Sequence, residues 1–172
     1  LDAEMAKFGD NQESFYHKTE HACYYPNGSM GFYAQCEHDK DVDNVIGAEV
    51  ALIIFDEAPT FQWEHMRLIG ASLRVAVGSG IQPMVRYLGN PVGQSIDELW
   101  KYFIDKDVTE EEDPEYRPED FRAIEIRLQD NHHLDEKQYR KQFAGLPEHY
   151  RKAWLDGVRV EVPRRERRRR VA

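Results

Sequence analysis

The stretch VALIIFDEA, residues 50 to 58, decides the fold of this chain, because a run of apolar residues ends abruptly at two carboxylates. A short apolar run rich in β-branched residues predicts a strand covered on both faces, which is typical of parallel sheets in α/β domains. Ligands of such domains bind beyond the carboxyl ends of the strands. The stretch therefore predicts chemistry at Asp56 and Glu57.

The two carboxylates suit different tasks. Asp56 could hold a hydrated Mg²⁺ through one oxygen, whereas Glu57, one residue later, points elsewhere and could take a proton from an attacking water. Together they form the Walker B arrangement of a nucleotide hydrolase. The alternative is a strand followed by an acidic helix N-terminus, since Asp and Glu are common in a first helical turn.

A helix and a second strand are predicted to follow. Apolar residues at helical spacing predict a helix over residues 61–75, and residues 82–88 predict a strand that ends in GNPVG, residues 89–93. A turn of this composition frees the backbone and presents one amide side chain. In a sheet whose neighbouring strand ends at Asp56 and Glu57, Asn90 could lie beside a γ-phosphate and sense its loss.

A β-hairpin is predicted before this sheet, with strands over residues 14–25 and 29–35 joined at Asn-Gly, the strongest short hairpin signal. With Asn-Gly at the centre of the turn, Cys23 lies opposite Phe32. Cys36 is then four pairs away along the ladder, roughly 13 Å, which is too far for a disulfide. The sequence therefore predicts two free thiols and a cytosolic setting.

The later segments are predicted from periodicity and helix-end signals. Ser95, with Glu98 three residues later, predicts a capping box at the start of a helix. An alternating pattern predicts a half-buried strand whose buried face includes Ile124 and Ile126. In chain order, the predicted segments are a helix over 95–105, an acidic surface loop over 107–120, the strand over 121–128, and helices over 135–144 and 147–155.

Composition agrees with one globular domain, since the chain has 172 residues and 41% of them are hydrophobic. No apolar run approaches a membrane span and no signal peptide is visible, so no membrane partner is expected. The net charge is -9, and the rest of the chain is more acidic still, because residues 164–170 carry six Arg. Such a field repels a phosphate polyanion, which argues against this chain gripping DNA alone.

Taken together, residues 26–157 resemble the ATPase domain of the large terminase subunit of tailed bacteriophages, the motor that pumps DNA into a procapsid. The resemblance implies an α/β fold: a partial P-loop NTPase sheet of the additional-strand, RecA-like type, flanked by helices, with a C-terminal helical linker or lid. The motifs that carry it are YPNGS at 25–29, GAE at 47–49, ALIIFDEA at 51–58, LGNPVG at 88–93, RLQDN at 127–131, LD at 134–135, LPE at 146–148 and RKAWLDG at 151–157.

The resemblance also implies a division of the chain. Residues 1–131 are expected to form a partial ATPase core with the hairpin, the Walker B strand and the coupling-motif strand. Residues 132–157 are expected to form the helical linker or lid subdomain. Residues 158–172 are an atypical Arg-rich tail, predicted to be disordered; the alternative is that its Arg cluster contacts DNA phosphates.

By the same resemblance, Asp56 contacts Mg²⁺, Glu57 activates water, and Gly89 with Asn90 forms the coupling motif that passes ATP hydrolysis to DNA movement. ATP and Mg²⁺ are the implied cofactors. The implied partners are double-stranded DNA, the portal protein of the procapsid, the small terminase subunit and further copies of the motor in a homo-oligomeric ring. The implied location is the host cytoplasm, transiently at the procapsid portal.

Arg74, near the end of the predicted helix over 61–75, is a candidate for contact with phosphate in this or a neighbouring subunit. Its planar guanidinium stays charged and binds phosphate oxygens with two hydrogen bonds. The alternative is a surface arginine whose stem covers apolar neighbours.

No G-x-x-x-x-G-K-[ST] loop occurs in the sequence, so this chain does not supply the Lys and the backbone N–H groups that hold nucleotide phosphates. We therefore interpret it as an internal piece of a longer motor, inactive alone, and in this family the parent protein also carries an endonuclease domain. The alternatives are a non-catalytic remnant or scaffold of a P-loop NTPase and a related helicase-type ATPase.

Overall fold

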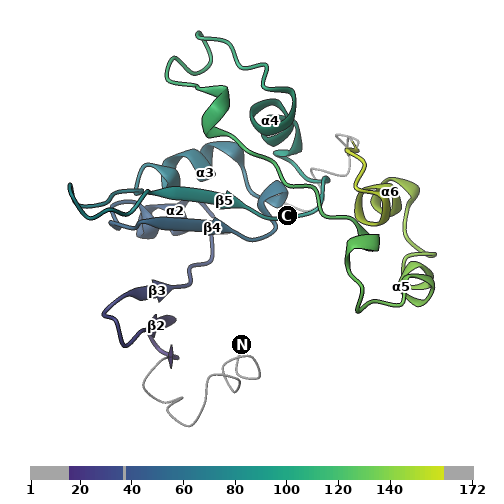
Figure 1. Cartoon of the computed structure of the whole chain (residues 1–172), viewed down its shortest axis with the longest axis horizontal. Helices are drawn as coiled ribbons and strands as arrows, with labels where there is room; N and C mark the ends of the chain where they lie inside the picture. Colours follow the sequence, from purple (N-terminus) through teal and green to yellow (C-terminus); the bar gives the residue numbers. More distant parts are fainter. Residues whose placement is uncertain (1–15, 37, 161–172) are drawn as a thin grey trace. The chain divides into compact units, whose positions relative to one another are not determined.

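The computed structural model describes residues 16–36 and 38–160, and the chain divides into two compact units, Leu1–Val45 and Ile46–Ala172. The first unit contains a three-stranded antiparallel sheet in the order β1-β2-β3 (Figure 1). Its elements are β1 (Tyr16–His17), β2 (Ala22–Tyr24), β3 (Met30–Phe32) and the helix α2 (Asp39–Val45).

The register of the β2–β3 hairpin differs from the predicted one by a single residue. Ala22 lies opposite Phe32, so the prediction that Cys23 does so is wrong. Pro26 explains the difference, because its fixed φ suits the second position of a type I turn. Gly28, with φ +83°, then takes the left-handed position at the end of a longer loop, instead of the centre of a two-residue turn.

The predicted strand over residues 14–25 is interrupted. A turn over residues 18–21 separates β1 from β2, and the two pair antiparallel, with Tyr16 opposite Cys23. His21 has a left-handed φ of +49°, which lets the chain reverse there. Both cysteines are free, as predicted. Residues 14 and 15 of that predicted strand lie outside the described residues.

The second unit is built on a two-stranded parallel sheet of β4 (Leu52–Phe55) and β5 (Met84–Tyr87) (Figure 1). Leu52 lies opposite Met84. The described residues therefore form an α/β fold, as predicted. The elements are β4 (Leu52–Phe55), α3 (Trp63–Gly70), β5 (Met84–Tyr87), α4 (Ile96–Trp100) with its π-helical continuation Lys101–Asp105, α5 (Glu136–Gln142) and α6 (Glu148–Asp156), with 3-10 turns at Ala58–Thr60, Pro118–Asp120 and Leu128–Asp130.

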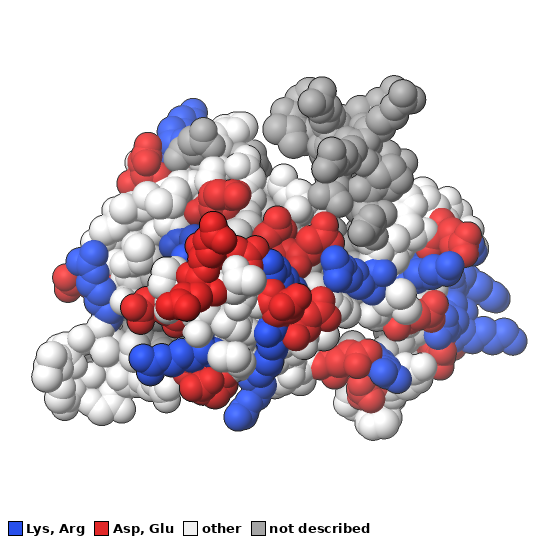
Figure 2. Space-filling model, turned by 90° about the horizontal axis from the view of Figure 1, so that it is seen from above, with Lys and Arg blue, Asp and Glu red and all other residues white. Residues whose placement is uncertain are grey.

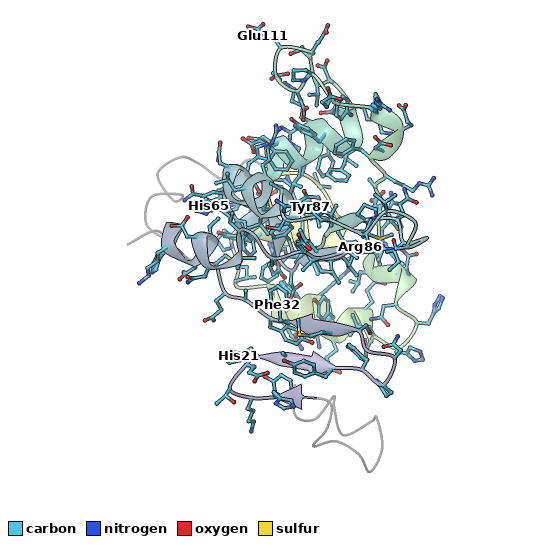
Figure 3. The ribbon with its side chains drawn as sticks, turned by 90° about the vertical axis from the view of Figure 1, so that its left-hand side faces the viewer. His21, Phe32, His65, Arg86, Tyr87 and Glu111 are labelled. Carbon is cyan, nitrogen blue, oxygen red and sulfur yellow. The ribbon has the colours of Figure 1, made fainter. Side chains whose placement is uncertain are left out.

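Aromatic side chains pack on one face of this sheet. The Phe55 ring lies 5.4 Å from the Tyr87 ring and 5.6 Å from the Phe61 ring, measured between centroids. Tyr87, labelled in Figure 3, also contacts Trp63 of α3 and Phe103 in the continuation of α4. Burial in this cluster raises the pKa of Tyr87 to about 12. Both helices therefore cover the same face of the sheet.

The opposite face of the sheet is open to solvent. Leu52 is 47% exposed and Ile54 is 53% exposed. The prediction that the strand is covered on both faces is therefore wrong for the described structure. Burial alternates along β4 because α3 and α4 lie on the side of Phe55 and Tyr87.

The predicted strand over residues 121–128 is absent from the structure. Ile124 and Ile126, expected on its buried face, are 76% and 80% exposed. Phe121, in the opposite phase, packs instead against Tyr102 and Phe103 of the aromatic cluster. No described strand pairs with this segment, so its alternating side chains do not lie on two faces of a sheet.

The two predicted C-terminal helices are confirmed as α5 and α6, which Figure 1 shows on the same side of the second unit. The Asp135 carboxylate caps α5 by accepting a hydrogen bond from the Gln138 N–H at 3.0 Å. The Phe143 and Trp154 rings pack edge to face, 5.4 Å apart. The lid role of this pair and the division at residue 131 stay predictions, and residues 161–172 of the predicted tail lie outside the described residues.

None of the helices within residues 16–36 and 38–160 has the length and apolar character needed to span a bilayer.

The acidic loop over residues 107–120 is anchored on one side. Glu112 receives a hydrogen bond from the Lys101 ammonium, and Asp113 lies 3.4 Å from the Arg67 guanidinium. Glu111 lies at the tip of the loop (Figure 3). On the face shown in Figure 2, acidic and basic side chains of the described residues lie interspersed. Part of the acidity is thus neutralised locally.

The Glu112 anchor predicts a specific acid titration. The hydrogen bond from Lys101, followed by bonds from the Thr109 N–H and hydroxyl, lowers the pKa of Glu112 to about 2. Because the folded pKa is below the ordinary value, the anchor is intact above about pH 4.5 and is lost as the pH falls toward 2. Carboxyl ¹³C shifts followed by NMR should show a midpoint near 2, and Lys101→Met should raise it. Lys106→Met, whose ammonium bonds the Pro118 carbonyl instead, should leave it unchanged, and an equal effect of both variants would contradict the assignment.

Candidate functional site

The carboxyl ends of β4 and β5 remain joined beyond the two strands. The Leu88 N–H donates to the Phe55 carbonyl at 2.9 Å, and the Ala58 N–H donates to the Leu88 carbonyl at 2.6 Å. These two bonds hold the chain just before Gly89 against both ends of the Asp56-Glu57 pair. The parallel pairing therefore brings the predicted carboxylates and the predicted coupling turn to one edge.

Glu57 has an unusual backbone conformation. Its φ of 52° and ψ of 41° lie in the left-handed region, which residues with a side chain rarely adopt. The Thr60 N–H and hydroxyl both donate to the Glu57 carbonyl, at 2.9 Å and 2.7 Å. Ala58 and Pro59 are buried, whereas Asp56 and Glu57 are exposed. The carboxylate pair therefore lies on the solvent side of a tight turn, and the two residues that follow the pair are buried.

Two glycines allow the GNPVG segment to lie directly against this turn. A Cβ at Gly89, which has φ +150°, would come within 3.3 Å of the Glu57 Cα and 2.6 Å of the Pro59 Cδ. A Cβ at Gly93 would come within 2.0 Å of the Pro59 carbonyl oxygen. Close approach of two backbones, as well as turn formation, thus requires glycine at both positions.

Ser95 completes this contact. Its side chain is 1% exposed, its N–H donates to the Pro59 carbonyl at 3.2 Å, and its hydroxyl donates to the Ala58 carbonyl at 3.3 Å. The predicted capping box with Glu98 is therefore wrong, because the hydroxyl satisfies a buried carbonyl of the turn instead of a helix N–H. The sequence analysis did not predict Ser95, Gly93 or Pro59 as parts of the site. The only sequence signal for them is a second glycine, Gly93, four residues after Gly89.

The side chains at this edge are available to a ligand. Within residues 16–36 and 38–160, no hydrogen bond or ion pair reaches the side chains of Asp56, Glu57 or Asn90. Carboxylate and amide oxygens are the donors that Mg²⁺ prefers. No described group of three or more His, Cys, Asp or Glu gathers here, so Mg²⁺ would complete its shell with water or phosphate oxygens, as it ordinarily does. The residues present therefore fit Mg²⁺.

Arg74 is not brought to this edge. Its N–H donates to the Val50 carbonyl at 2.9 Å, and its guanidinium lies 3.8 Å from the Glu49 carboxylate. Val50 precedes β4, so about 20 Å of extended chain separates it from Asp56. Contact between Arg74 and a phosphate at the same site within this chain has no support, and contact in a neighbouring subunit stays a prediction.

The GNPVG segment also contacts the C-terminal helix. Val92 is buried with Ala153 of α6, and Tyr150 and Val160 pack against this pair. The Val160 N–H donates to the Pro91 carbonyl at 3.3 Å. One short segment therefore touches the carboxylate turn on one side and α6 on the other.

Comparisons with protein-family models, with curated proteins and with solved structures each found no match to this chain. The resemblance to terminases accordingly rests on the motifs quoted above, and the geometry of the site rests on the contacts of this chain.

The approach of Gly93 to Pro59 predicts a sharp contrast between two Gly→Ala variants. Gly93→Ala should lower the free energy of unfolding by about 2 to 3 kcal/mol, because the new methyl overlaps the Pro59 carbonyl. Gly70→Ala, at the end of α3 where a Cβ meets nothing within 4 Å, should be neutral or stabilise by about 0.5 kcal/mol. Urea unfolding followed by circular dichroism measures both. Equal effects would show that the close approach is not present in solution.

Proposed function

We propose that this chain supplies the magnesium-binding and water-activating edge of an ATP-hydrolysing motor, the large terminase subunit that translocates viral DNA into a procapsid. The observation that carries the proposal is the joining of the ends of β4 and β5, with the Ala58 N–H bonded to the Leu88 carbonyl. This bond holds the Asp56-Glu57 turn beside Gly89 and Asn90, which supports the proposal that the two carboxylates form a Walker B pair. Two motifs recognised separately in the sequence thus occupy one edge.

The chemistry assigns each side chain a separate task. Asp56 would hold Mg²⁺ through a carboxylate oxygen, and Glu57 would accept a proton from the attacking water. Mg²⁺, when bound, supplies charge neutralisation for the phosphate oxygens. Asn90 presents an amide that can donate to the γ-phosphate. These tasks need accessible side chains without partners: within the described residues Asp56 and Glu57 are exposed, Asn90 is half-buried, and none of the three side chains has a bonding partner.

In the proposed motor, the GNPVG segment would couple ATP hydrolysis to movement, because it contacts the carboxylate turn on one side and α6 on the other. Loss of the γ-phosphate at Asn90 would shift this segment, and the packing of Val92 on Ala153 would carry the shift to α6. In the proposed motor, α5 and α6 form the linker or lid, copies of the protein form a ring, and the partners are double-stranded DNA, the portal protein and the small terminase subunit. The work takes place in the host cytoplasm at the procapsid portal.

Metal binding can be tested on this chain directly. Mn²⁺, which substitutes for Mg²⁺ and broadens nearby NMR signals, should broaden the amides of residues 56–58 and 89–90. Asp56→Asn should weaken this effect about tenfold or more, because it removes the charged ligand. Glu64→Gln, an exposed carboxylate change in the first turn of α3, should leave it unchanged. Broadening that is absent, or that is insensitive to Asp56→Asn, would favour a non-catalytic scaffold.

Turnover is tested in the longer protein that supplies a phosphate-binding loop. Glu57→Gln should preserve nucleotide binding and lower kcat about 10²-fold or more, because the substitution keeps the size of the side chain and removes the base. Steady-state ATPase measurements and a nucleotide titration separate the two effects. Retained turnover would remove Glu57 from the role assigned to it.

A further inference from the structure

The left-handed backbone of Glu57 needs support from outside the residue. An L-residue with a side chain is disfavoured at φ 52°, so an exposed residue holds this conformation only when its surroundings enforce it. The carboxylate contributes nothing, because no described residue bonds it. The local turn contributes two bonds from Thr60 to the Glu57 carbonyl.

The remaining support comes from residues 93–95, at the end of the turn that follows β5. Ser95 donates from its N–H to the Pro59 carbonyl and from its hydroxyl to the Ala58 carbonyl, so the carbonyls of the two residues that follow Glu57 are bonded to one residue. Gln94 adds a bond from its amide nitrogen to the Thr60 carbonyl at 2.5 Å. Gly93 permits all of this by leaving room for the Pro59 carbonyl.

We infer that Ser95, with Gly93 beside it, is a positioning residue that holds Glu57 in its left-handed conformation and thereby orients the carboxylate proposed as the base. The inference rests on the proposed function for the role of the carboxylate, but the positioning itself is a property of this chain. When the Ser95 hydroxyl bond is lost, the bonds that remain no longer enforce the conformation, and residue 57 relaxes to a negative φ, which rotates its Cα–Cβ bond away from the present direction. Ser95 acts through Glu57 and touches no reacting atom.

Ser95→Ala is the deciding variant, and Ser72→Ala is its matched control. Both serines are 1% exposed, but the Ser72 hydroxyl accepts from the Gly47 N–H at the opposite end of β4. A positive φ produces a strong NOE between the amide and α protons of the same residue. Ser95→Ala should weaken this NOE at Glu57 and speed hydrogen exchange of the Ala58 amide about tenfold, the effect of losing one buried hydrogen bond. Ser72→Ala should do neither.

A rescue separates positioning from general stability. Glycine adopts positive φ without support, so adding Glu57→Gly to Ser95→Ala should return the Ala58 exchange rate to within about twofold of the original. A merely structural role for Ser95 predicts no rescue. An unchanged NOE and exchange rate in Ser95→Ala, or a failed rescue, overturns the inference.

Two further arms keep the inference testable. If Ser95→Ala does not fold, Gln94→Ala removes the exposed neighbouring bond and should speed Ala58 exchange in the same direction but less; no change there overturns the inference. Mn²⁺ broadening of residues 89–90 is recorded on each variant. Absence of broadening in the unmodified chain, together with the expected NOE and exchange changes, would refute the proposed function while supporting the positioning.

Discussion

The close approach of the 89–95 backbone to Pro59 is the constraint on which the second unit depends. It is possible only with glycine at residues 89 and 93, since a side chain at either would overlap the turn that follows β4. The approach in turn lets Ser95 bond the carbonyls of the turn and start α4 immediately afterwards. Because α4 begins there, its continuation can place Phe103 against Tyr87, which fixes the covered face of the sheet.

This constraint makes the turn that carries Asp56 and Glu57 stiff, and the proposed catalysis would need a stiff turn there. The carboxylate turn is bonded through Ala58 to Leu88, directly after β5, and through Pro59 to Ser95, directly before α4. The same segment packs on Ala153 through Val92. The carboxylate turn and α6 therefore contact the same short segment.

Periodicity predicted the helices and strands whose pattern lies within their own sequence. It failed where the conformation depends on contacts with a distant segment. The sequence predicted β4, α3, β5, α5 and α6, and the rule that parallel strands end at one edge predicted the meeting of the two motifs. It missed the hairpin register, because Pro26 selected a longer turn, and it missed the exposure of Ile124, because nothing pairs with that segment. It assigned Ser95 to a helix cap, because no pattern reveals that a distant carbonyl needs a donor. Contacts between remote segments are not encoded in spacing.

The carboxylate pair is distinguished from the other acidic groups of this chain by the backbone conformation of Glu57. Some acidic side chains of the described residues pair with cations, as Glu112 with Lys101, Glu136 with Arg140 and Glu148 with Lys152 show, whereas others, such as Glu64 and Glu110, do not. Asp56 and Glu57 stand adjacent, both exposed, with like charges and with one of them in a disfavoured backbone conformation. The backbone conformation of Glu57 costs stability, and the bonds from Thr60 and Ser95 hold it in place. A disfavoured backbone conformation that surrounding contacts hold in place is typical of functional sites, and this is the feature of Glu57 that favours the role proposed for it.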